Sequence, residues 1–276
     1  MIKSIDIRGF RNAEDIYFNP EHRIAERGKE SLALLLVYAS LSAITPRKTE
    51  AGSISKKRVT ELIEKRLKGN FRIEKFGELV RPGKKAARVI IKTDDGLLDY
   101  EISGGSSSRV CVSSIPEKWN DNCLCYVSPR SVIEYGTSLD PVYENFDIPI
   151  RRSDVDLSLL LSRPKLKEIS EEALRFASNY IATATLGAGR VFLEGTVYKL
   201  WKSNGDIIRT SLLSSRDKVL AELLLLINNG AIKRGSILMA DCLDTIIEPS
   251  SLDFLFSQLK ECGVQVIETQ RQYKHE

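Results

Sequence analysis

An α/β fold is predicted by three observations along this chain of 276 residues. Short apolar runs typical of strands alternate with leucine-rich helical segments. A serine-rich turn at 210–218 opens an apolar helix over 219–230. The apolar run 236–240 then ends on Asp241, and a second apolar run, 264–267, lies near the end of the chain. Strands that alternate with helices in this way are typical of domains in which helices cover a sheet.

The composition is that of a globular protein, with 42% hydrophobic and 28% charged residues. There is no run of 18 apolar residues that would span a bilayer, and the charged N-terminus lacks a signal-peptide core. The closest pair among the five cysteines, Cys123 and Cys125, has no second pair, and the chain has only two histidines. We therefore expect a cytoplasmic protein with no metal site and no membrane partner.

Positive charge is concentrated in one segment. Residues 47–92 contain 15 Lys and Arg against 5 Glu, which gives this segment about +10 in a chain of net charge +4. Such a segment is suited to contact phosphate groups. A solvated insertion with an ordinary charged surface explains the same pattern.

The first half of the chain predicts two strands and two helices before a group of antiparallel strands. Alternating apolar residues predict a strand over 2–10 and another over 15–18. The apolar segment 28–44 predicts a buried helix that Pro46 ends. Further strands are expected at 88–92, 98–102, 109–113 and 122–127, and an exposed helix at 57–68. In the second half we expect helices at 154–161 and 167–185, a hairpin over 190–201 and a strand at 206–209.

The order of these segments resembles an ABC-type ATPase head of the SMC/RecF/OLD-like branch, an AAA-type ATP-binding group that acts mostly on DNA. The residues that carry the resemblance are the N-terminal hairpin, Gly28-Lys29 before a helix, Leu213-Ser214-Ser215 before the next, the strand to Asp241, and the last strand to Thr269. The resemblance implies a P-loop NTPase-like fold with a mixed central sheet, an antiparallel β sub-sheet and a short helical insertion.

The resemblance also implies the domain organisation. We expect a single domain over residues 1–276 with two lobes. Within it, the basic segment 47–92 is expected to be a mobile insertion, and residues 151–189 a helical arm. The arm lacks sustained heptads, so no long coiled coil is expected.

The phosphate-binding loop of the family, G-x-x-x-x-G-K-[ST], is only partly kept. Gly28 and Lys29 match, with Ser31 nearby, but Arg23 takes the first glycine position and Glu30 the position of the Mg²⁺-binding hydroxyl. A carboxylate a few ångströms from a triphosphate costs on the order of several kcal/mol. A helix with a glutamate-rich first turn explains the same residues without a nucleotide.

The other family motifs are altered as well. Arg216 replaces the glycine that follows Ser214 and Ser215 in the signature motif. Asp241 matches the Walker B acid, but Cys242 stands where the family has its catalytic glutamate, and a thiol is a poor base for this task. Gln270 takes the place of the switch histidine and cannot titrate.

These departures predict a catalytically degenerate, ABC ATPase-like protein (a pseudo-ATPase) that acts as a non-hydrolysing binding or regulatory subunit in repair, segregation or defence of DNA. A protein partner is expected, either a second copy, an active ATPase or a nuclease subunit, and DNA is a further candidate partner. No resident cofactor is expected.

Two alternatives remain open. In the first, Gly28, Lys29, Ser31, Ser214, Ser215 and Asp241 still bind ATP and Mg²⁺ and give weak ATP hydrolysis. In the second, the protein is a nucleic-acid-binding module that uses the basic segment, with Lys56, Lys57, Arg58, Lys84 and Lys85 as its phosphate contacts.

Overall fold

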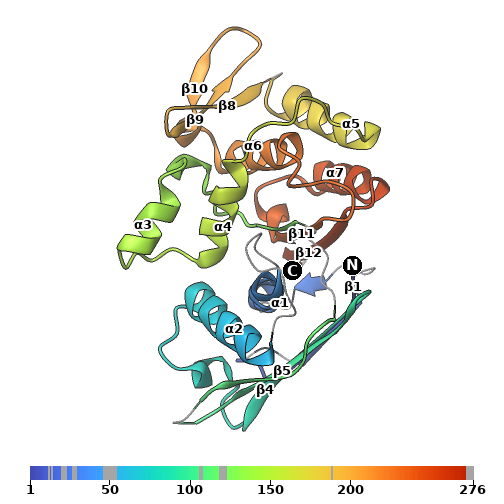
Figure 1. Ribbon diagram of the computed structural model, residues 1–276. Helices are drawn as coiled ribbons and strands as arrows, with labels where there is room; N and C mark the ends of the chain where they lie inside the picture. Colours follow the sequence, from blue (N-terminus) through green and yellow to red (C-terminus); the bar gives the residue numbers. More distant parts are fainter. Residues whose placement is uncertain are drawn as a thin grey trace, which may run out of the picture. The chain divides into compact units, whose positions relative to one another are not determined.

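The computed structural model describes residues 1–11, 13, 15–19, 24–26, 30–45, 55–105, 108–117, 123–187 and 189–271. The chain divides into two compact units (Figure 1), one formed by Met1–Asn122 with Arg271–Glu276 and the other by Cys123–Gln270. In the part of the chain that is described, no helix is long and apolar enough to cross a membrane.

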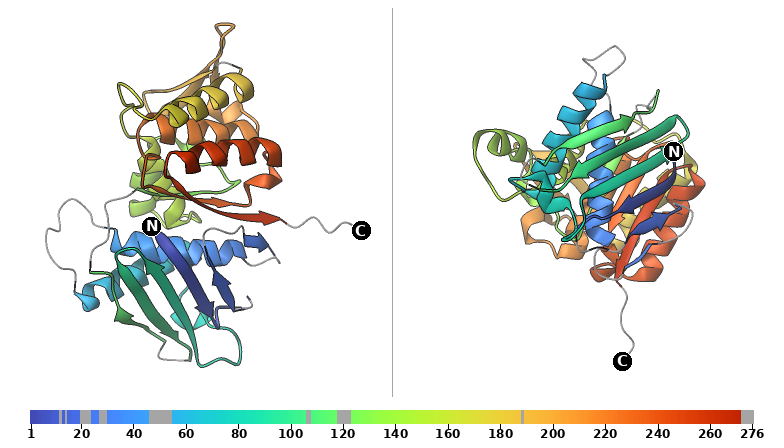
Figure 2. Two further views of the ribbon diagram at one scale, coloured as in Figure 1. Left: turned by 90° about the vertical axis from the view of Figure 1, so that its right-hand side faces the viewer. Right: turned by 90° about the horizontal axis from the view of Figure 1, so that it is seen from below.

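The first unit contains an antiparallel sheet of five strands in the order β2-β1-β4-β5-β6. Two helices, α1 and α2, cover one face of this sheet (Figure 2). The elements of the unit are β1 (Ile2–Arg8), β2 (Ile16–Phe18), β3 (Ile24–Glu26), α1 (Glu30–Ile44), α2 (Lys56–Phe71), a 3-10 turn (Phe76–Leu79), β4 (Ala86–Thr93), β5 (Gly96–Ser103) and β6 (Val110–Ser114).

Alternating side chains give this sheet one buried face. In β4, Ala87, Val89 and Ile91 are fully buried, while the residues between them are more exposed. A hydrogen bond of 2.7 Å between the hydroxyls of Ser40 in α1 and Tyr100 in β5 joins the helix layer to the sheet. The basic segment 47–92 therefore includes two elements, α2 and β4, that build this unit. Residues 46–54 lie outside the described part.

The second unit combines a parallel sheet, a small antiparallel sheet and a group of helices. Its elements are β7 (Leu124–Val127), α3 (Leu139–Asn145), α4 (Arg152–Leu161), α5 (Glu172–Tyr180), a π-helical turn (Ile181–Thr185), β8 (Arg190–Glu194), β9 (Val197–Trp201), β10 (Ile207–Arg209), α6 (Ser215–Asn228), β11 (Ile237–Asp241), α7 (Pro249–Glu261) and β12 (Gln265–Arg271), with 3-10 turns at Ile133–Tyr135, Thr210–Leu212 and Leu243–Thr245.

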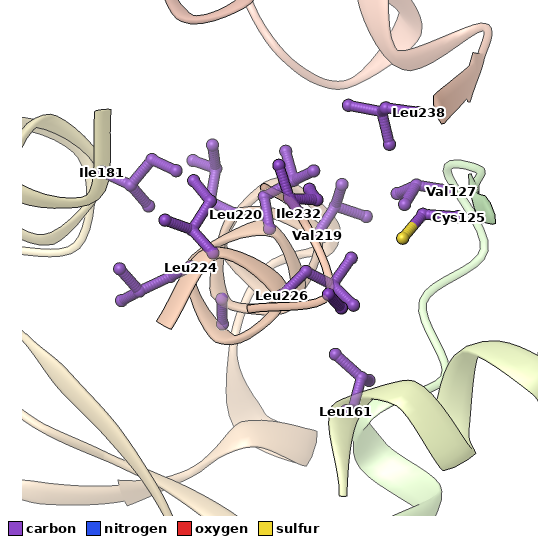
Figure 3. Packing of buried hydrophobic residues seen from close by; sticks show 14 of the residues in the cluster. Cys125, Val127, Leu161, Ile181, Val219, Leu220, Leu224, Leu226, Ile232 and Leu238 are labelled. Carbon is purple, nitrogen blue, oxygen red and sulfur yellow. The ribbon is translucent and has the colours of Figure 1, made fainter. Parts of the chain in front are cut away.

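The central strand of the parallel sheet is β11, which pairs with β7 on one side and with β12 on the other. The strands β8, β9 and β10 form a separate antiparallel sheet with β9 in the middle. Helix α6 lies in the core of the unit (Figure 3), where its leucines pack against residues of β7, β11, α4 and the π-helical turn. The parallel and antiparallel sheets with their helices confirm the predicted α/β class with an antiparallel sub-sheet.

The helices of the expected arm differ in length from the prediction. The helix expected at 154–161 is present as α4, but the one expected at 167–185 is an α-helix only over Glu172–Tyr180. It continues as the π-helical turn Ile181–Thr185. Residues 167–171 form no helix, and the hydroxyl of Ser170 donates to the side chain of Glu171 at 2.6 Å. Ser170 and Glu171 thus lie just before the first turn of α5.

Candidate functional site at the end of the parallel sheet

The candidate site lies at the carboxyl end of the parallel sheet in the second unit. Asp241 is the last residue of β11 and is aligned with Thr269 of β12. On the other side of β11, Tyr126 of β7 is aligned with Met239. Because the carboxyl ends of parallel strands meet at one edge of a sheet, residues far apart in sequence converge there.

Asp241 accepts a hydrogen bond at each carboxylate oxygen. The hydroxyl of Tyr126 donates to Oδ2 at 2.6 Å, and the hydroxyl of Thr269 donates to Oδ1 at 2.7 Å. Asp241 is only 4% exposed, and both of its partners are buried as well. A buried carboxylate bound by two hydroxyls is held in a fixed orientation, since moving it would leave polar groups unpaired.

Tyr126 acts as a donor in this arrangement. Burial raises the pKa of Tyr126 well above its ordinary value, and the nearby charge of Asp241 raises it further. The phenol therefore keeps its proton and directs it at the carboxylate.

Cys242 follows the acid in a left-handed backbone conformation, with φ 50° and ψ 37°. Its N–H points at Thr269, with distances of 3.0 Å to the carbonyl oxygen and 3.1 Å to the hydroxyl. The thiol lies 3.5 Å from the same hydroxyl. Left-handed geometry costs a non-glycine residue about 1–2 kcal/mol, so these contacts hold the chain in an unfavourable conformation. The position at which the family has its catalytic glutamate is therefore occupied by a thiol that faces Thr269.

Gln270 does not join this group. Successive side chains of a strand point to opposite faces. The side chain of Thr269 reaches Asp241, whereas the amide nitrogen of Gln270 lies 3.3 Å from Oε2 of Glu268, on the same strand. Thr269 and Gln270, although adjacent in sequence, therefore have their side chains on opposite faces of the sheet.

The signature-like residues form a helix cap. The hydroxyl of Ser214 accepts a hydrogen bond of 3.1 Å from the N–H of Asp217, and Ser215 begins α6. This is the geometry of an N-cap, as the sequence predicts. Both serines and Arg216 are exposed.

The phosphate-loop positions can be placed only in part. Ser31 is the second residue of α1 and is half-buried. Gly28 and Lys29 lie outside the described residues.

The candidate nucleic-acid residues fall into two groups at opposite ends of α2. Lys56, Lys57 and Arg58 form its first turn, where Lys56 donates to the carbonyl of Ser113. Lys84 and Lys85 follow Val80, which pairs with Phe10, and Phe10 in turn packs on Phe71 at the last turn of α2. A helix of 16 residues is about 24 Å long, so the structure does not bring the two groups together.

Glu222 is a second buried acid, and it lies close to the chain that follows β7. Its Oε1 accepts bonds from the hydroxyl of Ser131 at 2.7 Å and from the N–H groups of Val132 at 2.6 Å and Ile133 at 3.0 Å. Its Oε2 has no hydrogen-bond partner among the described residues. Burial raises the pKa of Glu222 to about 7.

Neither Tyr126 nor Glu222 was expected to take part. Tyr126 lies in an apolar strand that reads as core, and Glu222 is a single charge in a leucine-rich helix. The only sequence signal is that one polar group stands in each otherwise apolar run, and such a group needs a buried partner.

The described residues around Asp241 differ from a magnesium–nucleotide centre in two respects. Such a centre needs a carboxylate that faces the ion, a hydroxyl on the metal and a base or water-positioning residue. Asp241 instead faces two hydroxyls of the protein, and Cys242 supplies no carboxylate. Among the residues that the structure describes, no group of three His, Cys, Asp or Glu side chains is placed to hold a metal ion.

The fold, with an acid at the end of the central parallel strand and a serine-capped helix before it, is that of P-loop ABC-type ATPase heads. A solved SMC head bound to the C-winged helix domain of ScpA aligns over 98% of this chain and 89% of its own, with 14% identity and a TM-score of 0.52. The SMC head with an extended coiled coil bound to the C-terminal domain of ScpA, from Pyrococcus furiosus, covers the same shares at 12% identity and a TM-score of 0.51.

RecF with bound ATP, a recombination mediator protein, aligns at 12% identity over 100% of this chain and 94% of its own, with a TM-score of 0.47. No protein-family model matches the sequence, and no curated protein matches it. The two SMC heads share the fold with this chain, and at identities this low the activity has to be argued from the site.

Proposed function

We propose that this protein is a catalytically degenerate ABC-type ATPase head that acts as a non-hydrolysing binding or regulatory subunit in a DNA-related process. The SMC-head fold supports the class of protein. The altered positions Arg23, Glu30, Arg216 and Cys242 support the loss of hydrolysis, because each removes a different part of the machinery.

The observation that carries the proposal is the hydrogen bonding of Asp241. In a working head the Walker B acid serves a metal ion, whereas here its two oxygens accept bonds from Tyr126 and Thr269. These buried bonds fix the orientation of the carboxylate. We infer a structural role for the acid, which joins β7, β11 and β12 at their carboxyl ends.

A protein partner follows from the same argument. The two SMC heads were solved with a domain of ScpA bound, so the fold offers surfaces that other proteins recognise. A head that performs no hydrolysis keeps a function only through what it binds. We propose a second copy of this chain, an active ATPase or a nuclease subunit as the partner.

Calorimetric titration with ATP and Mg²⁺ tests the proposal, with Lys29→Ala as the matched variant. We expect no ATP binding that depends on Lys29, so that any heat is the same in the unchanged protein and in the variant, and no phosphate release from either protein. Saturable binding that Lys29→Ala abolishes would overturn the loss of nucleotide binding and favour an ATP-binding protein with residual activity.

A further inference from the structure

A cavity of about 400 Å³ lies in the second unit, among α5, α6, the start of β8 and residues 165–169. These elements are neighbours in Figure 1. None of its lining residues belongs to the group around Asp241. Its volume lies within the range of small-molecule sites in proteins.

Four basic side chains from three separate segments line the cavity: Lys165 and Lys167 before α5, Arg175 in α5, and Arg190 in β8. Among the lining residues that the structure describes, Glu168 is the one acidic residue.

None of these four cations forms an ion pair with a described residue. Arg152 of the same unit is different, because carboxylates of Asp140, Glu144 and Asp156 lie within 3.7 Å of its guanidinium. All four side chains around the cavity are exposed, so solvent weakens the repulsion among them, and an anion bound between them would lower it further.

The rest of the lining is part polar and part apolar. The hydroxyl of Ser178 donates to the amide oxygen of Asn228 at 2.9 Å, which leaves the N–H donors of that amide for a ligand. Ala182, Val191 and Leu224 add an apolar surface. A ligand that suits this lining has an anionic group and a less polar part.

The backbone beside the cavity has an unusual conformation that positions Arg190. Ala182 lies in the π-helical turn, and its carbonyl accepts a bond of 2.9 Å from the N–H of Gly189. A Cβ at Gly189 would lie 2.4 Å from a methyl group of Leu200, so a larger residue here would have to displace that side chain. Single π-helical turns are frequent at functional sites.

We propose that this cavity binds a small phosphorylated molecule, with the phosphate among Lys165, Lys167, Arg175 and Arg190 and a less polar part against Ala182, Val191 and Leu224. Phosphate suits several converging cations, and arginine binds it through two parallel hydrogen bonds. A small ligand is favoured over a nucleic-acid strand because the apolar surface lies inside a cavity of limited volume, whereas a strand needs an extended basic track.

Calorimetry with AMP and with inorganic phosphate as probes tests this proposal. We expect saturable binding of AMP and at least a tenfold loss of affinity in Arg175→Glu. The matched control is Arg209→Glu. Arg209 is an exposed arginine of β10, in the antiparallel sheet that also contains β8, and it is not among the residues that line the cavity. An equal loss in Arg209→Glu means general charge attraction and overturns the proposal.

A second variant tests the cavity without changing its charge. Ala182→Leu places a larger side chain in the cavity, and we expect it to weaken AMP binding at least tenfold while thermal unfolding stays cooperative. If Ala182→Leu does not fold, Asn179→Trp fills the cavity from an exposed helix position. Absence of binding by both AMP and phosphate at millimolar concentration overturns the proposal. Binding of a 12-nucleotide single strand without binding of AMP overturns it in favour of nucleic acid.

Discussion

The end of the parallel sheet and the basic cavity differ in what their polar groups contact. At the sheet end, Asp241 accepts bonds from two hydroxyls of the protein itself. Around the cavity, Arg175 and Arg190 are exposed and form no ion pair with a described residue. Buried groups that satisfy one another stabilise the fold, whereas exposed cations that form no ion pair are open to a ligand. The region that looks most like an ATPase is therefore the one we expect to bind least.

Among the predicted changes in stability, the largest is expected from Asp241→Ala. The change leaves the buried hydroxyls of Tyr126 and Thr269 without their acceptor, and each unsatisfied group costs about 1–3 kcal/mol. We expect the free energy of unfolding to fall by about 4 kcal/mol, as measured by urea denaturation. Asp241→Asn keeps one acceptor and should lose less. AMP binding should be unchanged in both variants.

The matched control for Asp241→Ala is Glu261→Ala, at an exposed acid at the end of α7. We expect a change of less than about 0.5 kcal/mol, as for most surface positions. If the two substitutions have equal effects, the structural role of Asp241 is wrong.

An intermediate change in folding stability is expected when the pH rises and Glu222 loses its proton. Burial raises the pKa of Glu222 from its ordinary value of 4.5 to about 7 in the folded protein. The folded state therefore holds a proton that the unfolded state has lost, and the contribution to stability is largest below pH 4.5 and is lost as the pH rises through 7. We expect a loss of up to about 3 kcal/mol.

Glu222→Gln isolates this contribution. Its amide oxygen still accepts from Ser131, Val132 and Ile133, but the side chain no longer titrates. Urea unfolding of both proteins at pH 5 and pH 8 gives the difference that belongs to Glu222. A difference that stays constant across this range contradicts the shifted pKa.

The smallest effect is expected from Cys242→Gly. Glycine removes the cost of the left-handed backbone, about 1 kcal/mol, but gives up the thiol contact with Thr269 and adds freedom to the unfolded chain. We expect a change within about 1 kcal/mol in either direction, measured as the urea midpoint. A loss above 2 kcal/mol would show that the thiol contact matters more than the backbone strain.

Local sequence patterns predict the strand and the helix cap at the end of the parallel sheet. They do not predict the side-chain contacts around Asp241. A run of apolar residues that ends on an acid predicts Asp241 at the end of a buried strand, and Ser214 three residues before Asp217 predicts the cap. The bond from Tyr126 depends on the register of two strands 115 residues apart, which no local pattern encodes. The side of the sheet to which Gln270 points is fixed by a second register, that of β12 against β11.

The helices show the same limit. Apolar residues in α7 are spaced for one buried face, at Leu252, Leu255, Phe256 and Leu259, so this helix was open to prediction and was missed. The short α3 has no such pattern. The cavity was not predictable, because its four cations come from segments that meet only in the folded chain.

The carboxyl group of Glu222 also has a thermal consequence. Near pH 6 the folded protein carries a proton on this side chain that the unfolded chain releases. Unfolding therefore acidifies its surroundings, and the buffer takes up the proton with its own heat of ionisation. The apparent unfolding enthalpy in a calorimeter then depends on the ionisation enthalpy of the buffer. The proton that one buried glutamate releases can therefore be detected by comparing buffers.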